Sequence, residues 1–291
     1  MSKTIVFFGT DTFSADALRS LIEADYTIGA VITKPDSKSG RGQHLSAPLV
    51  KQIALENSIP VWQPTKLIDV LEDIEKLGDV VGVLSSYGRI IPQAIIDLFR
   101  PGIINIHPSL LPLYRGPSPI ETAIANGDTQ TGVSIMKLSA EMDAGPVYAQ
   151  EVYTLDGTET TATLQPTLAA LGARMLIETL PGIIEGNLLP SPQANAAIYC
   201  YLLKKEDAYL NPEEITAIQA ERHVRAFIEF PKTKMTILEQ SIIVTKAHVV
   251  SEAESVLDIA FKDGQFLSID ELIGPSGRKM SGSDFLNGYA A

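Results

Sequence analysis

The sequence is poor in the residue types that build several common kinds of site. Cysteine occurs once, at Cys200, which excludes an internal disulfide framework and is typical of a reducing compartment. The four histidines lie far apart, so no metal-ligand spacing is present and we predict no bound metal. The first apolar run begins at Thr4, with no signal-peptide core before it, and no apolar run approaches membrane-spanning length. We therefore expect a cytoplasmic protein with no membrane partner.

Positive charge is also scarce, since 23 Lys and Arg oppose 35 Asp and Glu and give a formal net charge of -12. A protein that holds nucleic acid usually presents a basic face to the phosphates. The segment 33–51 departs from the acidic average, and its serines and glycines predict a flexible loop that could contact phosphate. An ordinary solvated loop is the alternative. The charged residues of this segment are Lys34, Asp36, Lys38, Arg41 and Lys51.

A dinucleotide fingerprint is missing as well. Gly9-Thr-Asp-Thr-Phe-Ser14 follows the first apolar run, where such a fingerprint would stand, but the spaced glycines of G-x-G-x-x-G are absent. A nicotinamide cofactor is therefore disfavoured.

The first part of the chain does contain a regular alternation of apolar runs and helical patterns. This alternation predicts an α/β fold with a Rossmann-like, doubly wound, mostly parallel sheet. Ser118-Pro-Ile-Glu121 resembles a capping box with proline at the first helical position, and Gly127 fits the end of that helix. The expected strands are 4–8, 26–32, 80–85, 102–107, 131–138 and 147–153, and the expected helices are 15–24, 47–57 and 92–99.

The second part of the chain predicts a different architecture. A helical stretch over 160–185, broken near Pro166 and Pro181, is followed by a proline-containing linker at 189–195. Another helix is expected from Asn211-Pro-Glu-Glu214 to about Phe227, and short hairpins after it predict a small β-barrel. The expected strands there are 235–238, 242–246, 256–262 and 265–269, the last two joined by Asp263-Gly264. The resulting division is a catalytic domain at 1–188, a linker at 189–206 and a barrel at 207–291.

Three polar residues could form a site for acyl transfer. Asn105 and His107 are two apart in an apolar strand, so their side chains share one face, and Pro108 stops the strand just after them. Ligands of parallel sheets bind beyond the carboxyl ends of the strands. An amide and an imidazole can polarise a carbonyl and hold its oxyanion, while a carboxylate such as Asp143 can orient the imidazole or accept a proton through water. The alternative is that Asn105 caps the strand and His107 is a buried structural histidine.

The segments around these residues carry a resemblance. Asn105-Ile-His-Pro-Ser-Leu-Leu-Pro112, followed by Tyr114-Arg-Gly116, resembles the signature of the formyl-tetrahydrofolate-dependent formyltransferase family. Met142-Asp-Ala-Gly145 stands where that family keeps its catalytic aspartate. Further similar segments cover nearly the whole chain, from Phe8-Gly-Thr-Asp-Thr-Phe13 to Pro275-Ser-Gly-Arg-Lys-Met280. The resemblance implies that Asn105, His107 and Asp143 are catalytic.

The resemblance also implies an activity and its partners. The expected reaction is transfer of a formyl group from 10-formyltetrahydrofolate, a co-substrate, to the α-amine of methionyl initiator tRNA for translation initiation, by a monomer. The implied tRNA contacts are Lys38, Gly40, Arg41 and Gly42, with help from an OB-like C-terminal barrel. Arg115 could contact the folate tail or a tRNA phosphate. The implied folate-binding residues are Ser86, Tyr87, Gly88, Ile90, Ile91, Ser109, Leu110, Leu111 and Pro112.

Several departures from the family pattern keep alternatives open. Gln43 and His44 stand where the family often has lysines, and Glu229 interrupts a stretch that is usually Asn-Pro-Trp-Pro. The region 200–291, where the family has a basic surface, carries 10 Lys and Arg against 14 Asp and Glu. One alternative is a sugar-nucleotide amine formyltransferase with the same folate donor. Others are a hydrolase that releases formate from that folate, and a non-catalytic folate- or RNA-binding module.

Overall fold

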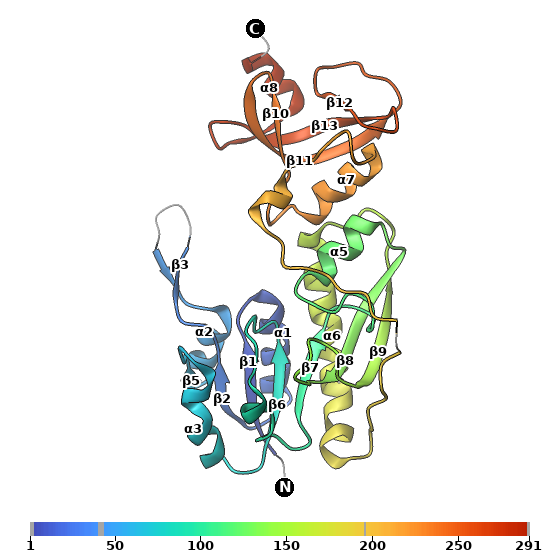
Figure 1. Cartoon of the computed structure of the whole chain (residues 1–291). Helices are drawn as coiled ribbons and strands as arrows, with labels where there is room; N and C mark the ends of the chain where they lie inside the picture. The colour runs from blue at the N-terminus through green and yellow to red at the C-terminus, as the bar shows by residue number, and fades with distance from the viewer. Residues whose placement is uncertain (1–2, 40–43, 195, 290–291) are drawn as a thin grey trace. The chain divides into compact units, whose positions relative to one another are not determined.

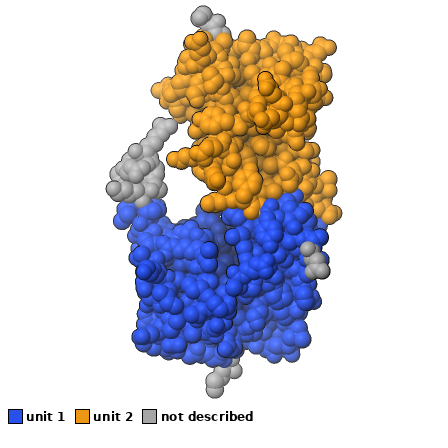
Figure 2. Space-filling model, viewed as in Figure 1, with its two compact units in different colours: residues 1–117, 131–153, 165–199 blue, residues 118–130, 154–164, 200–291 orange. Residues whose placement is uncertain are grey.

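The structure is a computed structural model that describes residues 3–39, 44–194 and 196–289. The chain forms two compact units, coloured separately in Figure 2. Unit 1 comprises residues 1–117, 131–153 and 165–199, and unit 2 comprises residues 118–130, 154–164 and 200–291. Each unit therefore draws on segments that are distant in sequence. The division at 189–206 expected from the sequence stays a prediction.

Unit 1 is built on a seven-stranded sheet with the order β5-β2-β1-β6-β7-β8-β9 (Figure 1). The strands from β5 to β7 are parallel, and β8 runs antiparallel to β7. The Rossmann-like part of the predicted fold class is thus confirmed. The strands are β1 (Thr4–Gly9), β2 (Ile28–Ile32), β5 (Val61–Trp62), β6 (Val80–Ser85), β7 (Ile103–His107), β8 (Gln130–Lys137) and β9 (Val147–Thr154).

The sheet is the buried layer of unit 1 because its central strands are apolar on both faces. All five residues of β7 are buried, and a core of aromatic and branched side chains gathers around Phe8 and Tyr87. The helices of this part are α1 (Thr12–Glu23), α2 (Leu49–Glu56), η1 (Leu67–Val70), α3 (Leu71–Lys76), α4 (Gln93–Ile96) and α6 (Thr161–Glu185).

The order of the strands defines where a ligand site is expected. In chain order the parallel strands run outward from β1 through β2 to β5, and then from β6 to β7 on the other side of β1. The direction of winding reverses between β1 and β6, and ligands of such sheets bind at the carboxyl ends of the strands beside that reversal. The loop after β6 lies at this point, and the end of β7 lies one strand away.

Unit 2 contains the second predicted architecture. Its sheet has the order β10-β11-β13-β12, with β14 also paired to β13, and every pairing is antiparallel. Irregular pairing between Val244 and Ala247 interrupts β11, and the sheet forms a half-barrel. The elements are α5 (Pro119–Asn126), η2 (Lys205–Ala208), α7 (Ala217–Ala226), β10 (Lys234–Ile237), β11 (Gln240–Val250), β12 (Asp258–Ala260), β13 (Phe266–Ile273), β14 (Lys279–Ser281) and α8 (Gly282–Tyr289).

Helix α6 differs from the sequence-based expectation in two ways. It is continuous through Pro166 and Pro181, both of which are exposed, so neither proline ends the helix. It is also long and apolar enough to cross a membrane by length and composition, so the expectation of no such run was wrong. Its apolar side is instead buried: Gly172 lies so close to Ile106 that a Cβ there would be 2.5 Å from it.

One other predicted helix start is wrong, and at a second, correctly predicted start the expected side-chain cap is absent. Asn211 does not begin α7, since its side chain accepts from the Glu213 N–H in a turn, and the helix starts after Thr216. Thr216 and Gln219 form a reciprocal capping box that fixes this start. At α5, Ser118 is the predicted N-cap, but its hydroxyl donates to the carbonyl of Tyr201 at 2.6 Å instead of capping the helix.

The described parts of the segment 33–51, residues 33–39 and 44–51, contain regular structure that was not predicted. Strands β3 (Ser37–Ser39) and β4 (His44–Ser46) pair as an antiparallel hairpin, and α2 begins soon after. Lys51 belongs to α2, and its ammonium lies 2.8 Å from both carboxylate oxygens of Asp36. One of the cations counted toward a basic loop is thus neutralised at the base of the hairpin.

Candidate active site

Asn105 and His107 lie where the sequence places them, at the third and last positions of β7. The strand is held on both sides, with Asn105 opposite Leu84 of β6 and opposite Met136 of β8. Both side chains are almost fully enclosed, at 4% exposure for Asn105 and 5% for His107. Buried polar groups need partners, so the contacts of these two side chains define the site.

The structure brings Asp143 to the same point. Its carboxylate accepts a long hydrogen bond from Asn105 Nδ2 at 3.4 Å, and its Oδ2 lies 3.8 Å from His107 Nδ1. The backbone N–H of Gly116 donates to Oδ2 at 2.9 Å. We call Asn105, His107 and Asp143 the reaction cluster.

The partner of His107 fixes which of its nitrogens carries hydrogen. Nε2 lies 3.0 Å from the carbonyl oxygen of Tyr114, which can only accept. In the neutral imidazole the hydrogen is therefore on Nε2, and Nδ1 faces Asp143 with a lone pair. Tyr114 has a left-handed backbone with φ of 56°, which brings its carbonyl to the ring. Neutral His107 can thus accept a proton at Nδ1, and it can donate there only after gaining a second hydrogen.

The Asp143 loop has supports that the sequence did not indicate. Asp143 has φ of 46°, an uncommon backbone conformation for a residue other than glycine. Gln193 donates to the carbonyl oxygens of Asp143 at 2.8 Å and of Gly145 at 2.7 Å. Gln193 lies in the segment read as a linker, and no periodicity or motif of the sequence marks it.

Arg115 forms hydrogen bonds in this same region. Its side chain donates to Gln193 Oε1 through two nitrogens, at 3.0 Å and 2.8 Å, and to the hydroxyl of Tyr199 at 3.1 Å. Its residue exposure is 8%. Arg115 and Gln193 also line a pocket of about 400 Å³ beside Ala144 and Pro146. The guanidinium thus has protein partners, and its contact with the folate tail or a tRNA phosphate stays a prediction.

The candidate folate loop follows β6, at the point where the winding reverses between β1 and β6. Ser86 donates to the Asp11 carboxylate, and Thr10 of the β1 side donates to the carbonyl of Tyr87 at 3.0 Å. Tyr87 and Ile91 are buried in the core, and burial raises the pKa of the Tyr87 hydroxyl. Gly88 is exposed, and Ile90 is 86% exposed. An apolar side chain so exposed at this edge of the sheet is available to a ligand.

The second candidate folate segment, 109–112, is fixed by hydrogen bonds from neighbouring strands. Ser109 is fully buried, and its hydroxyl donates to the carbonyl of Leu113 at 2.6 Å. Gln150 donates to the carbonyl of Leu111 at 2.8 Å and to the hydroxyl of Ser134 at 2.9 Å. Leu110 and Pro112 remain partly exposed, while Leu111 is buried. Folate binding by this segment stays a prediction.

The expected tRNA contacts are only partly within the described residues. Lys38 lies in β3, opposite Leu45 of β4. Gly40, Arg41 and Gly42 lie outside the residues that the structure describes. Among the described residues, no group of three or more His, Cys, Asp or Glu side chains could hold a metal ion.

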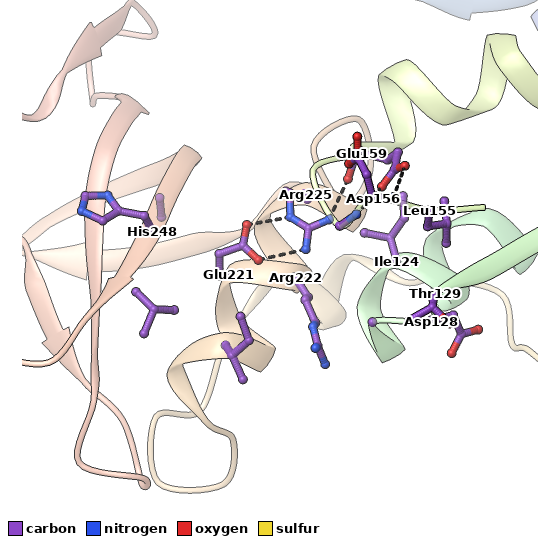
Figure 3. A pocket seen from close by; sticks show the side chains of 15 residues that line it. Ile124, Asp128, Thr129, Leu155, Asp156, Glu159, Glu221, Arg222, Arg225 and His248 are labelled. Carbon is purple, nitrogen blue, oxygen red and sulfur yellow. Dashed lines mark hydrogen bonds and ion pairs between the residues drawn. The ribbon is translucent and has the colours of Figure 1, made fainter. Parts of the chain in front are cut away.

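Unit 2 has a pocket of its own, of about 380 Å³, which contains none of the residues expected to be functional (Figure 3). Arg225 lines this pocket. Its guanidinium donates to both carboxylate oxygens of Glu221, at 2.6 Å and 2.9 Å, and to the carbonyl of Glu159 at 2.8 Å. Arg222 donates to the carbonyl of Asn126 at 3.2 Å. These contacts join α7 to the segments on either side of the pocket.

Comparison with known proteins gives similarity over almost the whole chain. Residues 2–180 match the model of the formyl transferase family, and residues 202–290 match its C-terminal domain. The methionyl-tRNA formyltransferase of Pseudoalteromonas translucida is 37% identical, over 98% of this chain and 93% of that protein. The methionyl-tRNA formyltransferase of Roseiflexus castenholzii is 39% identical, over 96% of this chain and 93% of that protein.

Solved structures share the fold at lower identity. HypX from Aquifex aeolicus, in complex with tetrahydrofolic acid, has a TM-score of 0.70 at 17% identity. The match covers 99% of this chain and 48% of HypX, so the chain spans about half of that protein. An N-formyltransferase from Helicobacter canadensis, in complex with folinic acid and dTDP-3-aminofucose, has a TM-score of 0.66 at 20% identity, over 92% of this chain and 99% of that one. The two matched models and the curated relatives place this chain in the formyl transferase family.

Proposed function

We propose that this enzyme transfers the formyl group of 10-formyltetrahydrofolate to the α-amine of methionyl initiator tRNA. The observation that carries the proposal is the convergence of Asn105, His107 and Asp143 at the end of β7, one strand away from the reversal of winding between β1 and β6. Relatives that act on methionyl-tRNA, similar over nearly their full length, support the choice of acceptor.

The reaction begins when the neutral amine attacks the formyl carbon and a tetrahedral intermediate forms. The carbonyl oxygen gains negative charge at this step, and hydrogen-bond donors placed in advance stabilise it. Asn105 Nδ2 is the donor that the geometry supports, since one hydrogen is directed to Asp143 and the second can reach the substrate oxygen.

The attacking nitrogen must also lose a proton. His107 Nδ1 has a lone pair on the side of Asp143, and this pair of groups is the proposed acceptor of that proton. The intermediate then collapses by breaking the bond between the formyl carbon and N10 of the folate. N10 takes up a proton, so the products are formyl-methionyl-tRNA and tetrahydrofolate.

The folate would lie across the carboxyl ends of β6 and β7. The pterin is assigned to the loop 86–91 and to the segment 109–112, which follow β6 and β7 and have apolar side chains that are at least partly exposed. The Lys38 hairpin is assigned to tRNA because it carries positive charge in an acidic chain.

The test is formyl transfer from formyl-tetrahydrofolate to charged initiator methionyl-tRNA. Uncharged tRNA and a panel of amino-sugar nucleotides are the parallel acceptors. Transfer to the charged tRNA alone is the expected result. Transfer only to a sugar amine would agree with the proposed role of the reaction cluster but contradict the proposed tRNA acceptor. Release of formate without any acceptor would indicate a hydrolase.

A further inference from the structure

Gln193 forms hydrogen bonds to the Asp143 loop and to Arg115, although no motif of the sequence predicts these contacts. Its amide nitrogen donates to two carbonyl oxygens of the Asp143 loop, those of Asp143 and Gly145. Its amide oxygen accepts from Nε and one terminal nitrogen of Arg115. Two donors and two acceptor positions are all that a glutamine amide offers, and each has a partner here.

Arg115 removes the rotational freedom of this amide. A guanidinium only donates, so it can face only the oxygen of Gln193, and the nitrogen must then face the loop. Arg115 is itself held by the hydroxyl of Tyr199 and by its own backbone N–H, which donates to the carbonyl of Ile198 at 2.9 Å. Arg115 therefore fixes the orientation of the Gln193 amide, with its oxygen toward Arg115 and its nitrogen toward the Asp143 loop.

The loop that Gln193 holds needs such support. Asp143 occupies the left-handed region, which is unfavourable for most residues other than glycine unless the surroundings compensate. Gly145 lies against the carbonyl of Lys137, where an added Cβ would come within 1.8 Å, so this side of the loop is closely seated on the end of β8. The other side is held by Gln193, and the Asp143 carboxylate is thereby directed to His107.

We infer that Gln193, oriented by Arg115, is a positioning residue for formyl transfer that keeps Asp143 in its reactive conformation. The inference rests on the proposed function and deepens it. Gln193 has no hydrogen bond to Asn105 or His107 among its described contacts, so its effect passes through the Asp143 loop.

Two substitutions of nearly equal size test this role. Gln193→Glu keeps the acceptors for Arg115 but sets carboxylate oxygens against the two loop carbonyls, and Gln193→Met removes the donors without adding charge. Both are expected to lower kcat by about tenfold to a hundredfold, because small displacements of a reacting group have effects of that size. KM for folate and tRNA should stay within about twofold, since neither substrate is held by Gln193. The substitution Asn187→Asp, at an exposed position shortly before Gln193 in the chain, adds a charge and should leave kcat within about twofold.

A double-mutant cycle separates positioning from a general structural role. In an Asp143→Asn background, Gln193→Met should lower kcat by less than about twofold, because the group that it positions is already changed. An equal loss in both backgrounds, or an unchanged kcat for Gln193→Met alone, would overturn the inference.

Hydrogen exchange supplies a readout that does not depend on the acceptor. The peptide 139–146 should exchange faster in both Gln193 variants than in the parent and the Asn187→Asp protein. Unchanged exchange would contradict the holding role even if kcat fell. If the parent transferred formyl to none of the amines, the proposed function would fail, and exchange would still decide whether Gln193 holds the loop.

Discussion

The reaction cluster and the β3–β4 hairpin are both polar parts of unit 1, but different interactions hold them in place. Asn105 and His107 are buried, and Tyr114, Gly116 and Gln193 hold the groups beside them through hydrogen bonds. The hairpin is held by strand pairing and by a tie at its base among Asp36, Lys51 and Gln63. A rigid site suits chemistry, whereas a peripheral charged segment suits binding. Substitutions should therefore change turnover at the first region and affinity at the second.

The largest effect is expected from Asn105→Ala. Removing one oxyanion donor typically lowers kcat by about a hundredfold to a thousandfold. Steady-state kinetics with charged initiator tRNA would measure this, with thermal unfolding as the control for folding. A loss of less than about threefold would show that Asn105 is not an oxyanion donor, and would remove the main contrast between the two regions.

A smaller effect is expected at the segment 109–112, which is proposed to bind folate. Gln150→Met removes the hydrogen bonds to the Leu111 carbonyl and the Ser134 hydroxyl. Each such bond contributes about 0.5–1.5 kcal/mol, so KM for the folate should rise by roughly threefold to tenfold with little change in kcat. Initial rates at varied folate concentration give this ratio. A fall in kcat alone would assign Gln150 to the reaction cluster instead.

Lys38→Ala tests the other side of the comparison. Loss of one phosphate contact should raise KM for tRNA by about threefold at low salt, reduce the salt dependence and leave kcat unchanged. Lys76→Ala is the matched control, because Lys76 is an exposed lysine of the same unit that pairs with Asp73. Equal effects of the two substitutions would mean that the hairpin contributes only general charge.

The same contrast explains what the sequence could predict. The strands were predictable because buried parallel strands are continuous apolar runs, and Asn105 and His107 could be paired because a strand of period two puts them on one face. Asp143 was added to them only by the family resemblance. Gln193 was not predictable, since its role depends on contacts 48 and 50 residues away in the chain. The pairing of β3 with β4 was not predicted, because it depends on contacts between two segments. The serine and glycine residues of this part of the sequence favour a loop prediction.

The smallest effect is expected at the base of the hairpin. Hydrogen bonds from Lys51 and then Gln63 lower the pKa of Asp36 below its ordinary value of 3.8. The carboxylate therefore stabilises the folded protein above the pKa of the unfolded chain, and this stabilisation is lost as pH falls through the lower folded pKa. Asp36→Asn should lower Tm by no more than about 2 °C at neutral pH, since the pair is partly solvated. The difference should shrink once the pH is below about 4, as unfolding curves of both proteins from pH 7 to 3 would show. A Tm difference that grew in acid would mean that the protonated carboxyl group of Asp36 stabilises the hairpin. The lower end of the hairpin, around Asp36 and Lys51, would then be as enclosed as the reaction cluster.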